Sequence, residues 1–264
     1  MVVHSPSRGS ADAPVGELLR GWRNTRRCSQ LDLAVEAGIS SRHVSFIETG
    51  RSRPTAAMIL RIAEYLDVPL RERNRLLLAG GYAPAYGEYG LDAPELATFR
   101  DALRGVLIAH MPFPALILDR HFDVVEANDA VATVVEGCSV ELLTPPVNVI
   151  RLGLHPDGLA PRITDLAPWR DHLLTQLTRR ASRTGDPRLA ELLGEVRGYP
   201  SPAGHAENPA GVAVELRLGH RLGELAFLSM AASVQTALDV TVDELTLELF
   251  HPADAATRVL MASA

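Results

Sequence analysis

The stretch SQLDLAVEAGISSRHVSFIETGRSR, residues 29–53, predicts two short helices joined by a tight turn. Ser29 is a favourable N-cap for the first helix, because its hydroxyl accepts from first-turn amides that have no helical partner. Gly38 follows that helix, and glycine adopts the positive φ that such a turn requires. Ser40 can cap a second helix over 41–49, whose apolar residues share one face. These signals together predict a helix-turn-helix; an ordinary αα-hairpin with a solvated arginine face is the alternative.

The polar face of the second helix carries the candidate DNA contacts. A recognition helix enters the major groove and contacts base edges through residues near its N-terminus. Arg42 is the principal candidate, because its planar guanidinium matches the two acceptors on a guanine edge. Further candidates are Ser41, Ser45 and Phe46 for base contacts and Arg51 and Arg53 for phosphate contacts. Phe46 can meet a thymine methyl group or simply pack against its neighbours.

At these residues the chain resembles a known family. The pattern SQxxLAxxAGIS…SxxExGRxxP, completed by Pro54, is similar to the XRE (Cro/CI-type) DNA-binding domain. The continuation VPLRERNRLLLAGGYAPAY, residues 68–86, looks like XRE regulators that carry an MmyB-like ligand-binding domain. The DNA contacts that this resemblance implies are Gln30, Ser40, Ser41, Arg42 and Phe46. Phe46 departs from the family, which often has a polar residue late in this helix.

Length and charge indicate two domains with different partners. The 264 residues have a net charge of −6, yet residues 1–80 hold 12 arginines against 8 acidic residues, and residues 81–264 hold 14 against 24. A basic head on an acidic remainder fits a DNA-binding domain joined to a domain that does not bind DNA. The expected boundaries are a disordered tail (1–14), a helix-turn-helix domain (15–81), a linker (82–94) and a second domain (95–264). No apolar run is long enough to span a membrane, which predicts a cytoplasmic protein that binds no membrane.

The second domain is predicted to be α+β. Two apolar runs around residues 115–118 and 122–127 flank a polar turn and describe a β-hairpin, after which Asn128 can cap a helix. Helical periodicity fills the middle, and strands are expected again at 212–218, 223–234 and 245–250. This order predicts one antiparallel sheet with helices on one face. It is a PAS-like plan, which the family resemblance also implies.

A sheet covered by helices leaves room for an apolar cavity that binds a small molecule. The resemblance implies a fatty acid or a similar long apolar ligand in this domain. A carboxylate head group would need an arginine, and the candidates are Arg151 or Arg170, beside Trp169 and Asn148. Each of these side chains can instead be plain core or surface. No catalytic, phosphate-binding or metal-ligand motif occurs, so the sequence predicts no enzyme, no metal and no cofactor other than a bound fatty acid as effector.

These features together predict a sequence-specific regulator of transcription whose C-terminal domain binds a small apolar effector. Homodimerisation is compatible with this prediction, since two heads on adjacent major grooves multiply specificity. Two alternatives stay open at this point. The C-terminal domain can be a protein-interaction module without a ligand, or an enzyme fused to a DNA-binding head.

Overall fold

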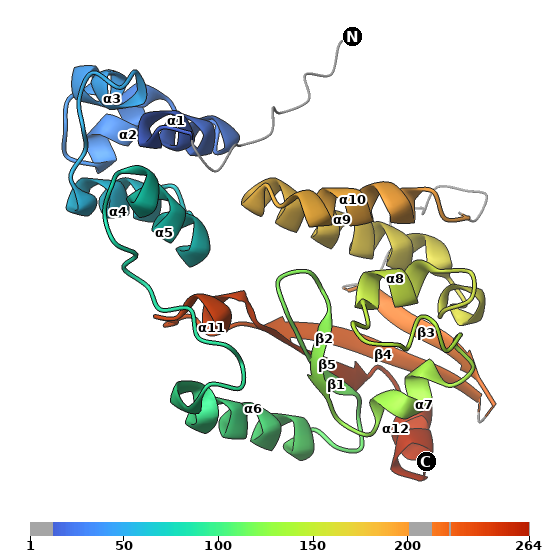
Figure 1. Ribbon diagram of the computed structural model, residues 1–264. Coiled ribbons are helices and arrows are strands. Elements are labelled where there is room, and N and C mark those ends of the chain that lie inside the picture. The colour runs from blue at the N-terminus through green and yellow to red at the C-terminus, as the bar shows by residue number, and fades with distance from the viewer. Residues whose placement is uncertain (1–12, 201–212, 222, 264) are drawn as a thin grey trace. The chain divides into compact units, whose positions relative to one another are not determined.

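The computed structural model describes residues 13–200, 213–221 and 223–263, and the chain forms two compact units (Figure 1). The first unit ends at Glu88 and also includes Leu238–Val240. The second begins at Tyr89 and takes the remaining residues. The boundary between the units therefore lies inside the predicted linker, 82–94. The predicted disordered tail, 1–14, falls almost entirely outside the described residues.

The first unit is helical, as predicted. Its helices are α1 (Val15–Thr25), α2 (Gln30–Glu36), α3 (Ser41–Glu48), α4 (Ala56–Tyr65) and α5 (Leu70–Ala79). The Ser29 hydroxyl accepts from the amide of Asp32, whose carboxylate accepts in turn from the Ser29 amide, so α2 begins with a full capping box. Gly38 has φ 64°, and the Ser40 hydroxyl accepts from the amide of His43 at the start of α3. The caps and turn expected from the sequence are therefore present.

Close contact between α1 and α3 depends on one glycine. A methyl group added at Gly16 would lie 2.1 Å from the carbonyl oxygen of Ile47, which is far inside van der Waals contact. Gly16 thus allows α1 to pack directly on the backbone of α3. The side chains of Leu19, Leu33, Val44 and Ile47 fill the core between the helices.

The segment after α5 is bound to the first unit. The buried Asn74 side chain accepts from the amides of Ala85 (3.0 Å) and Tyr86 (3.1 Å) and donates to the carbonyl of Tyr86 (2.8 Å). The next residue, Gly87, accepts from the amide of Val240 at 2.8 Å. Residues 238–240 therefore complete this unit, although they come from late in the chain.

The second unit contains a five-stranded antiparallel sheet. Its strands are β1 (Ala115–Leu118), β2 (Val124–Ala127), β3 (Glu215–His220), β4 (Gly223–Ala232) and β5 (Thr246–Pro252). The strand order is β2-β1-β5-β4-β3, and every neighbouring pair is antiparallel. The predicted hairpin and the predicted returning strands are thus all present. The α+β fold class is confirmed, and the sheet with its helices is consistent with the predicted PAS-like plan.

Helices cover the inner face of this sheet, which carries Leu116, Leu118, Leu225 and Phe227. The helices of the second unit are α6 (Ala97–Ala109), α7 (Val131–Val135), α8 (Val149–Leu154), α9 (Leu166–Thr184), α10 (Pro187–Arg197), α11 (Val240–Glu244, whose first residue belongs to the first unit) and α12 (Ala255–Ser263). Residues from α8, α9 and α10 join the core above this face (Figure 1). Across the described parts of the chain, no helix is both long and apolar enough to cross a lipid bilayer.

One helix lies on the opposite, outer face. Ala115 and Ile117 alternate with the inward-facing residues of β1 and pack with Leu107 of α6 and with Leu245. Asn128, expected to cap the next helix, instead accepts from the amide of Ala115 and donates to the carbonyl of Leu107. That prediction was wrong, because the side chain holds β1 to α6.

Candidate DNA interface and ligand-binding domain

The recognition helix α3 exposes its N-terminal polar residues. Ser41 and Arg42 are exposed and Ser45 is half-buried, whereas Val44 and Ile47 are buried in the core of the unit. This arrangement leaves the face with the predicted base contacts open to solvent. Ser40, an exposed residue, uses its hydroxyl as the N-cap of this helix.

Phe46 organises the arginines of this face. The guanidinium carbon of Arg42 lies 5.2 Å from the centre of the Phe46 ring, and that of Arg51 lies 6.0 Å from it. Both contacts fall within the range of cation–π attraction. The guanidinium groups of these two arginines make no hydrogen bond or ion pair with any other described residue. Their donors are therefore available to an outside acceptor, while the aromatic ring restrains where they point.

A buried charged cluster holds the helices of this unit together. The Glu48 carboxylate, at the end of α3, accepts from Arg23 Nε at 2.6 Å and Nη2 at 3.0 Å. It also accepts from Gln30 Nε2 at 2.7 Å. The same hydrogen bond and charge raise the pKa of Arg23. Gln30, an expected DNA contact, is thus fixed by Glu48, a residue that sequence reasoning missed because its partners lie 18 and 25 positions away.

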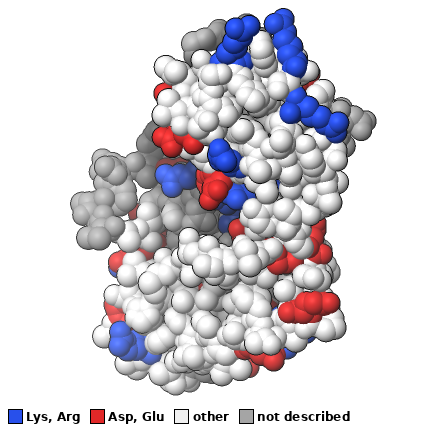
Figure 2. Space-filling view, turned by 90° about the vertical axis from the view of Figure 1, so that its left-hand side faces the viewer, with Lys and Arg blue, Asp and Glu red and all other residues white. Residues whose placement is uncertain are grey.

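Several arginines of this unit, Arg23 among them, also bind backbone carbonyls near helix ends. These bonds join Arg23 to Cys28, Arg26 to Leu66 and Asp67, Arg53 to Gly80, Arg61 to Ala37, and Arg73 to Val68. Arg53, expected at a phosphate, therefore uses its described bonds to hold the end of α5. A phosphate contact by Arg53 stays a prediction. Figure 2 shows basic side chains projecting at the end of the unit that carries α3.

In the second unit, the predicted ligand residues lie in and beside the helical layer. Asn148 caps α8 and donates to the His121 carbonyl and to Asp123 Oδ1, each at 2.8 Å. Arg151, in α8, forms a two-pronged ion pair with Glu195 of α10, with both N–O distances 2.7 Å. That ion pair lowers the pKa of Glu195 to about 2. Asn148 and Arg151 therefore already have polar partners.

Trp169 and Arg170 lie side by side at the start of α9, and both are buried. Trp169 packs in the core, with its ring 5.4 Å from that of His172. Arg170 is 7% exposed and donates through Nη2 to the carbonyls of Val196 and Arg197. Its other terminal nitrogen, Nη1, is buried without a hydrogen-bond partner. No acidic side chain pairs with Arg170 among the described residues, so this buried cation lacks a described counter-charge.

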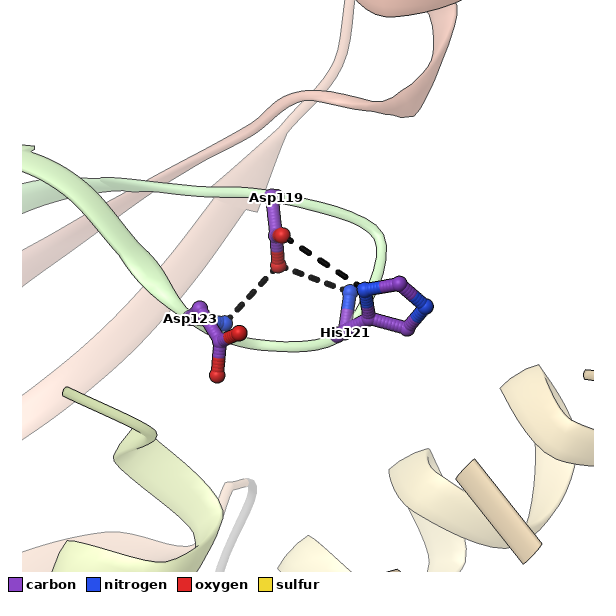
Figure 3. Close-up of side chains that lie close together, drawn as sticks. All are labelled: Asp119, His121 and Asp123. Atoms are coloured by element: carbon purple, nitrogen blue, oxygen red, sulfur yellow. Dashed lines mark hydrogen bonds and ion pairs between the residues drawn. The ribbon is translucent and has the colours of Figure 1, made fainter. Parts of the chain in front are cut away.

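A third cluster lies on the turn between β1 and β2. Asp119, His121 and Asp123 bring carboxylate and imidazole atoms within 4.8 Å of one another (Figure 3). Asp119 Oδ1 accepts from the amides of His121 and Asp123. Arg188 of α10 lies 2.5 Å from Asp123 Oδ2 and 3.2 Å from His121 Nδ1. A guanidinium thus already occupies the place beside these groups where a metal cation would bind.

The cluster joins the hairpin turn to the helical layer. His121 Nε2 lies 2.9 Å from Asp186 Oδ2, at the start of α10. Burial opposes ionisation of Asp186, but hydrogen bonds from His121 and from the Arg188 amide keep its pKa below the ordinary value. We interpret the cluster as an ion-pair network that fixes α10 over the sheet.

Comparison with known proteins agrees with both units. Residues 19–73 match the model of a helix-turn-helix family. Over 84 residues the chain is 38% identical to RghRB of Bacillus subtilis, described as an uncharacterized HTH-type transcriptional regulator. That alignment covers 31% of this chain and 58% of the relative. Residues 99–263, more than half of the chain, match the model of the MmyB-like transcription regulator ligand binding domain. The chain therefore belongs to the MmyB-like transcription regulator family, with a helix-turn-helix at its N-terminal end.

Proposed function

We propose that this protein is a transcriptional regulator that binds double-stranded DNA through α3. The observation that carries the proposal is the exposed pair of arginines over Phe46, whose guanidinium groups have no hydrogen-bond or ion-pair partner within the described chain. We expect Arg42, near the N-terminus of α3, to donate both prongs of its guanidinium to a guanine. We expect Arg51, beyond the end of the helix, to contact a phosphate.

The test compares three arginine variants on a selected operator and on mismatched sites at fixed salt. Arg42→Ala is expected to lose about 1–3 kcal/mol of discrimination at one base pair. Arg51→Ala is expected to weaken binding to all sequences. It should also reduce the slope of log binding constant against log salt concentration by about 1 in magnitude. Arg258→Ala, which removes an exposed arginine of the second unit, is the control. Unchanged sequence preference in Arg42→Ala would refute its role in base recognition.

We further propose that the second unit binds a small apolar effector with an acidic head group, such as a fatty acid. The support is Arg170, because a buried guanidinium with an unbonded N–H is costly until an acceptor reaches it. Arg151 is the weaker candidate, since Glu195 already neutralises it. Trp169 and the apolar inner face of the sheet would then contact the chain of the ligand.

Native mass spectrometry of the purified protein tests the effector proposal, followed by lipid analysis of any released molecule. We expect a long-chain acid in the wild type and in Arg151→Gln, and its loss in Arg170→Gln. Acid retained by a folded Arg170→Gln variant would refute the assigned anchor. An empty wild type with no thermal shift across a series of acyl chains would instead favour a domain that binds a protein partner.

An effector can change DNA affinity only if it binds the DNA-competent and incompetent arrangements with different affinities. We therefore propose that the acid shifts operator affinity. The measurement is DNA binding with and without saturating acid, performed on the wild type and on Arg170→Gln. An equal response of the two proteins would place any effect of the acid outside this site.

A further inference from the structure

A cavity lies under helix α6 on the outer face of the sheet, away from the helical layer that holds Arg170. It has a volume of about 230 Å³ and lies between α6 and the β1–β2 hairpin. Its apolar walls are Leu91, Phe99, Leu103, Ile117, Val125 and Leu245. In Figure 1, α6 lies on the side of the sheet opposite to α9 and α10. This cavity is therefore separate from the effector site proposed at Arg170.

The charged groups at its rim neutralise one another. Arg104 Nε lies 2.7 Å from Glu126 Oε1. Arg100 donates to the carbonyl of Leu91 and lies 3.7 Å from Asp92. An acidic ligand would have to compete with these carboxylates, and a cationic ligand with the arginines. The rim therefore favours a neutral molecule.

Size and lining limit the ligand further. Apolar cavities of about 150 Å³ hold benzene, and six of the ten residues that line this cavity are apolar. A long acyl chain is too large for this volume. We propose that the cavity under α6 binds a compact, neutral, apolar molecule of roughly the size of an aromatic ring or a fused pair of rings.

The walls of the cavity include the two places where the chain passes to the first unit. Leu91 follows the unit boundary at Tyr89 by two residues. Leu245 directly follows α11, whose first residue, Val240, donates to Gly87 in the first unit. A ligand that displaces Leu91 or Leu245 acts directly on these connections. Binding in the cavity would thereby alter DNA affinity, a step that rests on the proposed function.

Indole is the probe, and methyl NMR of the full-length protein is the measurement. We expect saturable shifts of the Leu91, Leu103 and Leu245 methyl groups. Val125 is 37% exposed, so Val125→Phe can fill the cavity from its rim and should weaken indole binding at least tenfold. Val106→Phe is the matched control, because Val106 is a 40% exposed valine of α6 that does not line the cavity, and it should leave binding unchanged.

Absent or non-saturable shifts in the wild type would overturn the proposal, as would unchanged binding by a folded Val125→Phe variant. Arg170→Gln should bind indole like the wild type, so failure of the acidic effector site and failure of this cavity are distinguishable. Operator binding with and without saturating indole tests the coupling. Equal affinities would overturn the coupling step, whereas a change that disappears in Val125→Phe would support it.

Discussion

The two units use arginine differently. In the first unit, several arginines hold backbone carbonyls near helix ends, and Arg42 and Arg51 lie over an aromatic ring with their donors free. In the second unit, arginines such as Arg151 and Arg188 pair with carboxylates. The arginines at the helix ends of the first unit thus bond uncharged carbonyl groups, and Arg42 and Arg51 have no carboxylate partner, whereas Arg151 and Arg188 of the second unit are neutralised by acidic side chains. A unit that binds a polyanion needs the first arrangement, because internal carboxylates would compete with phosphates.

The largest expected effect comes from Glu48, the buried carboxylate that pairs with Arg23 in the first unit. Glu48→Ala leaves the guanidinium of Arg23, which is 11% exposed, without its carboxylate, and loss of one partner from a buried pair costs about 3–5 kcal/mol. Urea unfolding followed by Trp22 fluorescence, in a Trp169→Phe background, should show this loss. Glu36→Ala removes an exposed acid of α2 and should have little effect.

The comparison also predicts that this damage stays local. Trp169 fluorescence in a Trp22→Phe background reports on the second unit, and its unfolding midpoint should not move in Glu48→Ala. An unchanged Trp22 transition would mean that the Arg23–Glu48 pair is not what joins α1 to α3. An equal shift of both transitions would show that the two units unfold together.

A smaller effect is expected from the network on the β1–β2 turn. Asp123→Ala removes the acceptor of Asn148 Nδ2 and Arg188 Nη2, which should cost the second unit about 2 kcal/mol. Trp169 fluorescence during urea unfolding measures it. Asp129→Ala, an exposed aspartate in the same segment, is the control. An unchanged free energy of unfolding in Asp123→Ala would show that α10 is held by apolar packing alone.

Phe46 offers a finer test of the DNA-binding unit. Phe46→Leu keeps an apolar side chain but removes the ring under Arg42 and Arg51, and exposed cation–π contacts are worth about 0.5–1 kcal/mol. Operator affinity should fall by that amount with base preference retained, while Phe46→Tyr should bind normally. If base preference also changed, Phe46 itself would contact a base.

The smallest effect concerns acid stability of the second unit. The Arg151 ion pair lowers the pKa of Glu195 to about 2 from an ordinary 4.5. The carboxylate therefore stabilises the folded state above pH 4.5, and this contribution is lost as the pH falls from 4.5 towards 2. Thermal melts across this window should be less pH-dependent in Glu195→Gln than in the wild type. Glu191→Gln, on the same helix, should retain the wild-type slope.

Features that depend on neighbouring residues could be predicted from the sequence, whereas contacts between distant residues could not. The caps at Ser29 and Ser40 and the turn at Gly38 were predictable because each depends on a few neighbouring residues. The α+β sheet was predictable from alternation along short segments. Glu48 was missed because its structural role depends on Arg23 and Gln30, which only folding brings next to it.

In the second unit, too, side-chain partners that are distant in the sequence could not be predicted. Asparagine often caps helices, but the side-chain amide of Asn128 instead bonds the backbone of β1 and of α6. Arg151 and Arg170 looked equivalent in the sequence, and only the fold separates them, since one meets Glu195 and the other meets two carbonyls. The polar partners of a buried side chain depend on packing between distant segments, which periodicity does not encode.

The contribution of residues 238–240 to the first unit affects how the molecule can be divided. Because Val240 donates to Gly87, a fragment that stops at Glu88 loses a hydrogen-bonded segment, and a fragment that starts at Tyr89 carries that segment without its partner. A protease cut in the linker would likewise leave two pieces associated through Leu238–Val240. Fragments meant to behave like the intact units therefore need this short segment supplied to the first unit, for example by fusing it after Glu88.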